Sequence, residues 1–184
     1  MPPRSKTAAL TSWYTPLDKK LNLHQIALFG MLGALTFGAK VAMSGLPNIE
    51  PVSLFVMLFA VVFGWKCLYP VYLYVAMEVM LYGINLWNIN YLYVWTILAF
   101  AAIFLRRLKN PLWWALLSGL FGLAFGLLCS PVYMAVGGSV SYGIRWWLSG
   151  IPFDLTHGAG NFVIALTLFV PLRKLLTRLY AKIQ

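Results

Sequence analysis

The 184-residue chain is 61% hydrophobic and only 10% charged, and its mean hydropathy is +0.80. This composition excludes an ordinary soluble domain, which needs far more polar surface, and predicts an integral membrane protein. The net charge of +10 would fit nucleic acid binding in a soluble protein, but the basic residues border apolar segments, so membrane orientation explains them better and no nucleic acid partner is expected. Four acidic residues are too few to cluster into a carboxylate metal site.

Apolar segments joined by short loops fill the chain after a polar, basic stretch at 1–20, which we interpret as a cytoplasmic tail. A helix needs about 20 apolar residues to cross the hydrocarbon core. Six crossings therefore occupy nearly all of residues 21–184, and the predicted fold is all-α, a single domain built as a six-transmembrane-helix bundle. The predicted spans are 23–44, 51–65, 68–86, 91–105, 111–136 and 152–176.

Lysines and arginines lie almost entirely on alternate loops. Only Lys40 and Arg145 fall on the other side. The twelve on the first side are Arg4, Lys6, Lys19, Lys20, Lys66, Arg106, Arg107, Lys109, Arg173, Lys174, Arg178 and Lys182. The positive-inside rule then predicts that both termini are cytoplasmic.

Three loops are expected on the outer side, at 45–50, 86–90 and 130–151. Glycines and prolines in the last of them are expected to break any helix. The aromatic residues Tyr133, Tyr142 and Trp146 argue against disorder there. We therefore predict that the 130–151 loop forms a lid or a cavity wall.

Asp154, His157 and Asn161 are spaced so that they share one face of a helix at the outer end of the sixth span. Ionisable groups at membrane depth are costly and tend to be functional, so this stripe is a candidate lining of a ligand pocket. The alternative is structural: Asp154 caps its own helix and His157 pairs with it.

A second outer cluster combines amides with aromatic rings, which suits a flat organic ligand with polar edges. The alternative is that the rings are interfacial anchors and the asparagines cap helices. The candidate ligand-binding residues of this cluster are Asn85, Trp87, Asn88, Asn90 and Tyr91.

Glu78 lies midway along the third span, and Lys40 is a possible partner for it. The small residues Gly30, Ala34 and Gly38 form a stripe on the first span that lets another helix approach, either within the bundle or from a partner subunit. Gly119, Gly122 and Gly126 form a similar stripe on the fifth span, for which we expect internal packing.

The chain lacks a Gly-x-x-x-x-Gly-Lys-Ser/Thr phosphate loop, so we do not expect it to hydrolyse ATP itself. Alternatives to a protein that only binds a ligand remain open. One is an integral-membrane enzyme that uses Asp154 and His157 as an acid–base pair, although no nucleophile accompanies them. The other is a proton-coupled carrier that uses Glu78, or a purely structural subunit.

Several stretches, in order along the chain, resemble a known family. They are Leu46–Ser53, Tyr82-Gly83, Trp87–Trp95, Phe121-Gly122, Phe125-Gly126, Ser149–Asp154, His157 and Asn161-Phe162. With them the chain resembles the substrate-binding membrane subunits, or S components, of energy-coupling factor (ECF) vitamin transporters.

The resemblance implies high-affinity capture of a vitamin outside a bacterial plasma membrane, with no cofactor of the chain's own and no catalysis. It also implies three partner subunits, a transmembrane scaffold and two cytoplasmic ATPases. The family's Ala-x-x-x-Ala docking pattern would correspond here to Gly30 and Ala34, with glycine replacing the first alanine.

Cobalamin is the favoured ligand, because the chain most resembles cobalamin-type and queuosine-precursor-type members and offers few outer bases for an anion. A queuosine precursor, folate or pantothenate are the alternatives.

Overall fold

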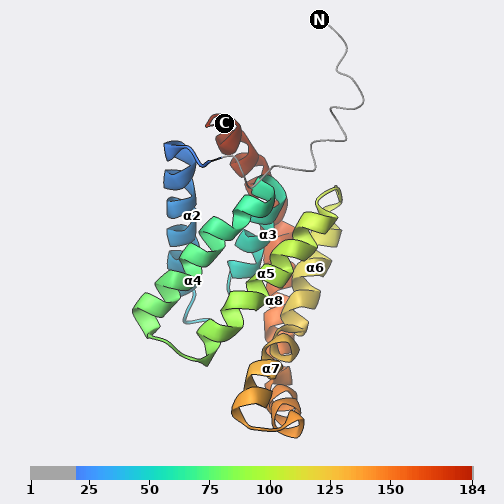
Figure 1. Cartoon of the computed structure of the whole chain (residues 1–184). Helices are drawn as coiled ribbons and strands as arrows, with labels where there is room; N and C mark the ends of the chain where they lie inside the picture. The colour runs from blue at the N-terminus through green and yellow to red at the C-terminus, as the bar shows by residue number, and fades with distance from the viewer. Residues whose placement is uncertain (1–19, 184) are drawn as a thin grey trace, which may run out of the picture.

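The computed structural model describes residues 20–183, and in this range every regular element is helical. The predicted cytoplasmic tail lies outside the described residues, apart from Lys20. The elements are α2 (Leu23–Ala42), α3 (Val52–Phe63), the 3₁₀ turn η2 (Gly64–Cys67), α4 (Leu68–Tyr82), α5 (Leu86–Leu105), α6 (Pro111–Leu123), α7 (Phe125–Val136) and α8 (Val140–Ala181). Figure 1 shows them as a bundle, from which the α7–α8 hairpin projects at one end.

Four helical stretches of the described chain are long and apolar enough to cross a membrane: Leu23–Ala42, Val52–Tyr82, Leu86–Leu105 and Pro111–Val136. This supports a multi-pass membrane protein with an all-α fold. The count of six crossings and the sidedness of the termini stay predictions.

The fourth predicted span begins earlier than expected, at Leu86 instead of residue 91. Asn85 is the reason, because its side chain accepts hydrogen bonds from the backbone N–H groups of Trp87 and Asn88 and so starts the helix. The expected 86–90 loop is therefore the first turn of α5. Gly83, with φ of 71°, ends α4 just before it.

The prediction of a loop at 130–151 is wrong. Residues 125–136 form α7, a turn follows at 137–139, and α8 continues for 42 residues from Val140. The prolines at 131 and 152 lie inside these helices, where both side chains are exposed. Gly143 serves close packing rather than a turn, because a Cβ there would collide with Met134 of α7.

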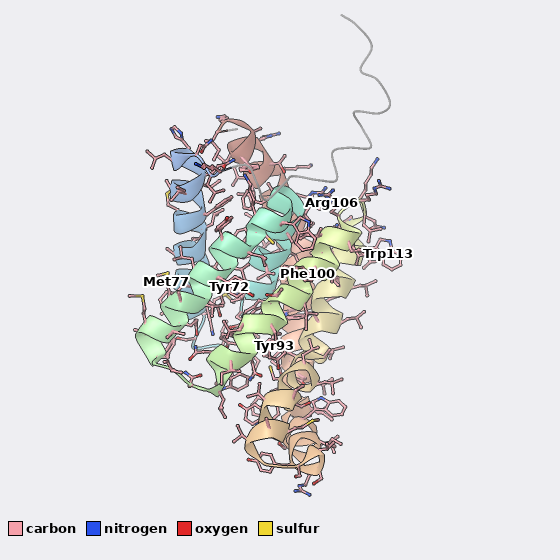
Figure 2. All side chains as sticks on the ribbon, viewed as in Figure 1. Tyr72, Met77, Tyr93, Phe100, Arg106 and Trp113 are labelled. Atoms are coloured by element: carbon pink, nitrogen blue, oxygen red, sulfur yellow. The ribbon has the colours of Figure 1, made fainter. Side chains whose placement is uncertain are left out.

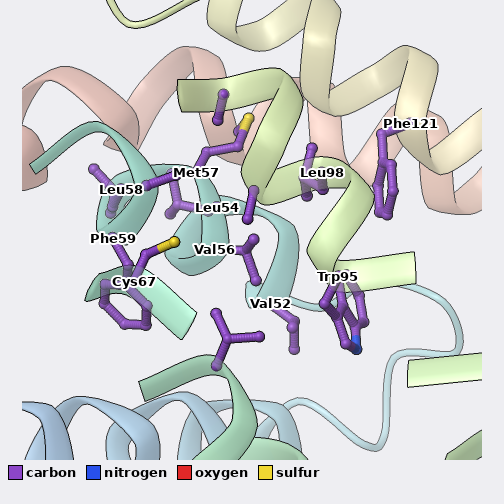
Figure 3. Close-up of a cluster of buried hydrophobic side chains, with 14 of the residues drawn as sticks. Val52, Leu54, Val56, Met57, Leu58, Phe59, Cys67, Trp95, Leu98 and Phe121 are labelled. Carbon is purple, nitrogen blue, oxygen red and sulfur yellow. The ribbon is translucent and has the colours of Figure 1, made fainter. Parts of the chain in front are cut away.

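The core centres on α3, which contacts α2, α4, α5, α6 and α8. Its side chains at Val52, Leu54 and Val56 are at most 1% exposed and share one cluster with Trp95 and Leu98 of α5 (Figure 3). The outward surface is apolar instead of polar. Phe100 and Trp113, for example, project away from the bundle and are about half exposed (Figure 2). An apolar outer surface around an apolar core is what a lipid environment requires.

Glycines hold α6 and α7 against α8, as the sequence predicted for Gly119, Gly122 and Gly126. A Cβ on Gly122 would lie 2.8 Å from both the Cα and the backbone N of Gly158 in α8. Gly158 in turn would bring a Cβ to 3.0 Å from the Gly119 carbonyl oxygen. The two backbones can approach this closely only because no side chain separates them.

The two ends of the bundle differ in charge. The C-terminus, η2 and the α5–α6 loop gather at one end, and the 43–51 and 83–85 segments lie at the other (Figure 1). Nine of the described bases belong to the first end, while Lys40 and Arg145 belong to the second. The nine are Lys20, Lys66, Arg106, Arg107, Lys109, Arg173, Lys174, Arg178 and Lys182.

We predict that Gly122→Ala destabilises the protein by about 1–3 kcal/mol, because the added methyl overpacks the contact between α6 and α8. The measurement is the thermal unfolding midpoint of the purified protein in detergent. Gly38→Ala is the matched control, since no atom lies within 4 Å of a Cβ there, and it should be neutral or slightly stabilising. Equal effects of the two substitutions would contradict the close helix contact.

Candidate binding cavity

A cavity of about 710 Å³ lies at the end of the bundle that carries the 43–51 and 83–85 segments. Five helices, α2, α4, α5, α7 and α8, form its walls together with the 43–51 and 83–85 segments. Its lining residues are Lys40, Asn48, Glu50, Glu78, Tyr82, Asn85, Trp87, Asn88, Tyr91, Phe125, Gly126, Trp146, Ser149, Gly150, Phe153, Asp154 and His157. The volume falls within the range of sites that enclose small organic ligands.

Lys40 of α2 organises one wall. Its Nζ donates hydrogen bonds to Glu78 Oε2 at 3.0 Å, Tyr91 OH at 3.1 Å and Tyr74 OH at 3.3 Å. Glu50 Oε2 lies 3.9 Å from the same nitrogen. One ammonium group thus ties α2 to α4, to α5 and to the 43–51 loop. The pairing of Lys40 with Glu78 that the sequence suggested is confirmed.

Glu50 lies in the loop just before α3, outside the membrane-spanning helices. Burial of its carboxyl raises the pKa of Glu50; the Lys40 ammonium opposes that shift and the Glu78 carboxylate adds to it. Glu78 itself is only 4% exposed, and its second oxygen, Oε1, has no hydrogen-bond partner among the described residues. This wall therefore holds two carboxyl groups around one cation.

Asp154 forms part of the opposite wall and caps a helix, although not its own. Its Oδ1 accepts a hydrogen bond of 3.0 Å from the backbone N–H of Gly126, in the first turn of α7. The N-cap residue of α7 itself, Ala124, makes no side-chain capping hydrogen bond. The structural alternative of self-capping is wrong, because Asp154 lies in the interior of α8.

His157 lies one turn after Asp154 in α8 and is 4% exposed. Its ring meets that of Phe125 edge-on, at a centroid distance of 4.8 Å. Its Nε2 has no hydrogen-bond partner within residues 20–183, and the Oδ2 of Asp154 has only the indole N–H of Trp147 near it. The two side chains therefore do not form the acid–base pair that the enzyme alternative needs in the structure as described.

Aromatic rings form the side of the cavity nearest the α7–α8 hairpin. The rings of Trp87 in α5 and Trp146 in α8 lie 6.0 Å apart. Tyr133 of α7 stacks on Trp146 at 3.7 Å and meets Trp87 edge-on at 6.3 Å. Tyr133 thus packs against both tryptophans but does not line the cavity itself.

Asn85 and Asn88 combine the two roles that the sequence left open. They form a reciprocal capping box at the start of α5, in which the Asn88 side chain accepts from Asn85 N–H at 2.9 Å. Both also line the cavity. The cap fixes the conformation of this edge of the site.

The cavity brings together most of the sequence-predicted binding residues, but four lie outside its lining. Asn161 donates to Ser53 Oγ at 3.0 Å and ties α8 to α3 in the core. Asn90 is fully buried and accepts from Tyr93 OH. Tyr142 is 42% exposed and packs on Gly137 in the hairpin turn, and Tyr133 lies behind Trp146. Those in the lining are Asn85, Trp87, Asn88, Tyr91, Trp146, Asp154 and His157.

Several lining residues were not among the predicted binding residues, notably Glu50, Phe125 and Phe153. Glu50 is one of only four acidic residues in the chain, and it lies beside Pro51 in a loop that the sequence predicts to face outward. The scarcity of acidic residues could have identified Glu50 as a candidate binding residue. Nothing in the local pattern distinguishes Phe125 or Phe153 from lipid-facing phenylalanines.

Comparison with known proteins found no matching family model, no matching curated protein and no matching solved structure.

We predict that Lys40→Met destabilises the protein by about 2–4 kcal/mol, because it leaves the buried Glu78 and the largely buried Glu50 carboxyl groups without the cation that they share. Adding Glu78→Gln to Lys40→Met should restore part of the loss, since the second carboxyl then has no charged neighbour. Thermal unfolding of the single and double variants in detergent measures this coupling. Lys174→Met, at an exposed site on the other end of α8, is the control. Strict additivity in the double variant would contradict the ion pair.

Proposed function

We propose that this protein captures a small organic micronutrient as the substrate-binding membrane subunit of an importer whose ATPases are separate chains. The observation that carries the proposal is the cavity. It is lined by rings, amides and charged groups, yet it sits at one end of a bundle whose outer surface is apolar. Polar groups at such depth in an apolar bundle are costly and are typical of functional sites.

The end of the bundle at which the cavity lies supports uptake into the cell and not export. The cavity lies at the end of the bundle that is poor in bases, and the positive-inside rule assigns that end to the outer face of the membrane. A bacterial plasma membrane is the proposed location, and both termini would be cytoplasmic. The resemblance to S components of ECF transporters leads to the same topology.

The volume of the cavity bears on which ligand it takes. About 710 Å³ accommodates a drug-sized molecule. A corrinoid is far larger than this volume, so cobalamin, which the sequence favoured, fits the cavity less well than a compact ligand does. Among the alternatives, the size of a queuosine precursor suits the cavity better.

Partner docking is proposed on α2. A Cβ on Gly30 or Gly38 would have no neighbour within 4 Å, and Ala34 is exposed. The Gly30, Ala34 and Gly38 stripe therefore faces away from its own bundle, in contrast to Gly33, which packs on Leu73 and Pro70 of α4. An outward stripe of small residues lets a second membrane helix approach closely. The proposed partners are the transmembrane scaffold and, through it, two cytoplasmic ATPases.

Capture is tested by native mass spectrometry of the chain purified from cells grown in rich medium. We expect one small molecule bound per chain, recovered unchanged. Trp146→Ala should reduce its occupancy about tenfold or more, since base or ring stacking on an aromatic side chain contributes about 1–3 kcal/mol. Leu120→Ala, on the lipid-facing surface, is the control. A chain that is empty under all growth conditions, or that converts the bound molecule to a product, would contradict capture.

Docking is tested separately. Ala34→Leu should impair uptake by the assembled transporter while ligand occupancy of the isolated chain stays unchanged. Leu35→Ala, which changes a neighbouring exposed position without adding bulk, should leave uptake near normal. Unchanged uptake and unchanged co-purification of the scaffold with Ala34→Leu would rule out docking through this stripe.

A further inference from the structure

The charged groups of the cavity are unequal in number. Its lining contains three carboxyl groups, Glu50, Glu78 and Asp154, and one ammonium group, Lys40. With all of them ionised, the lining carries a formal surplus of two negative charges. Arg145, the other base at this end, is exposed and outside the lining.

The single cation has no donor left for a ligand. An ammonium group has three N–H donors. Those of Lys40 are matched by three acceptors, Glu78, Tyr74 and Tyr91, at 3.0–3.3 Å. A carboxylate or phosphate that entered the cavity would have to break one of these bonds to reach the ammonium, and it would face the three carboxyl groups.

Acceptors, by contrast, are in surplus. Glu78 Oε1 has no hydrogen-bond partner among the described residues, and Asp154 Oδ2 has only the indole N–H of Trp147 near it; both residues are more than nine-tenths buried. Glu50 accepts no hydrogen bond within residues 20–183, and its nearest cationic atom is 3.9 Å away. Buried acceptors without donors cost free energy, so a ligand that brings N–H groups gains by satisfying them.

The aromatic residues in the lining favour the same kind of ligand. Trp87, Tyr91, Trp146 and Phe153 present rings to the cavity. The Lys40 ammonium already lies 4.8 Å from the centre of the Tyr91 ring. Electron-rich ring faces attract cations and stack on flat heterocycles.

We infer that the cavity binds a flat organic nitrogen base that bears a protonated amine or several N–H donors, and that it rejects molecules whose polar group is a carboxylate or phosphate. Its carboxyl groups provide the counter-charge and the acceptors, and the tryptophan and tyrosine rings hold the plane of the base. This inference rests on the proposed capture function and narrows its substrate class. Folate and pantothenate, both carboxylates, are excluded by it.

Two pairs of probes test the inference, each pair sharing one ring system and differing in charge. They are 7-aminomethyl- against 7-carboxy-7-deazaguanine, and pyridoxamine against 4-pyridoxate. Isothermal titration to the full chain in nanodiscs should show the amine member of at least one pair binding about tenfold or more tightly than its carboxylate. Equal or tighter binding of the carboxylates would overturn the inference.

Charge variants assign the preference to the cavity. Glu78→Gln should reduce the amine-to-carboxylate ratio several-fold. Glu50→Gln should do the same and does not disturb any hydrogen bond, so it keeps the test valid if Glu78→Gln fails to fold. Arg145→Gln changes a charge at the same end but outside the lining and should leave the ratio unchanged. If neither glutamate variant changes the amine-to-carboxylate ratio from its wild-type value, the inference is overturned.

The outcomes separate this inference from the capture function. Binding of the carboxylate probes as tight as that of their amine partners, or tighter, would leave capture standing and refute the preference for bases. If no probe binds, the molecule that co-purifies with the chain decides: a nitrogen base supports the inference, and a carboxylate or phosphate refutes it. If no probe binds and nothing co-purifies, both proposals fail.

Discussion

Burial of the Lys40 ammonium is the interaction on which the rest of this structure depends. It lies near the end of an otherwise apolar helix, and its three hydrogen bonds reach two residues of α4 and one of α5. A cation in such a place is stable only if its donors are satisfied and its charge is balanced. The surrounding tyrosines and glutamates satisfy it, and in doing so they fix the positions of three helices and one loop. The polar wall of the cavity is a consequence of that arrangement.

The opposite wall depends on a different constraint, the close approach of α8 to α6 and α7. Gly122 and Gly158 allow the backbones to meet, and Asp154 then reaches the first turn of α7 and caps it. The two walls leave unsatisfied acceptors between them. A bundle built for stability alone would fill this space with apolar side chains, since well-packed apolar residues match or exceed the stability of buried ionic groups. The retained polar groups are the strongest structural argument that the cavity binds something.

Much of this architecture follows from the sequence, because apolar length and loop charge are strong and local signals. The first span, the glycine packing at 119, 122 and 126, and the pairing of Lys40 with Glu78 were predicted and are found. The 130–151 region was not. Glycine and proline were interpreted there as helix breakers, but Gly143 is needed for contact with α7, and the prolines are accommodated in exposed positions. Tertiary packing decided the conformation, and a single sequence does not reveal it. The sequence also could not tell Asn161, which bonds Ser53 in the core, from its neighbours on the same helix face that line the cavity.

The central claim is that a binding cavity opens on the face of the membrane opposite the termini. Cysteine accessibility in intact cells tests it most directly, since both native cysteines are buried. A membrane-impermeant maleimide should label Ser149→Cys, in the cavity lining, and should not label Lys109→Cys, in the loop at the other end, until the cells are opened. Labelling of Lys109→Cys in intact cells, with Ser149→Cys protected until lysis, would contradict the account.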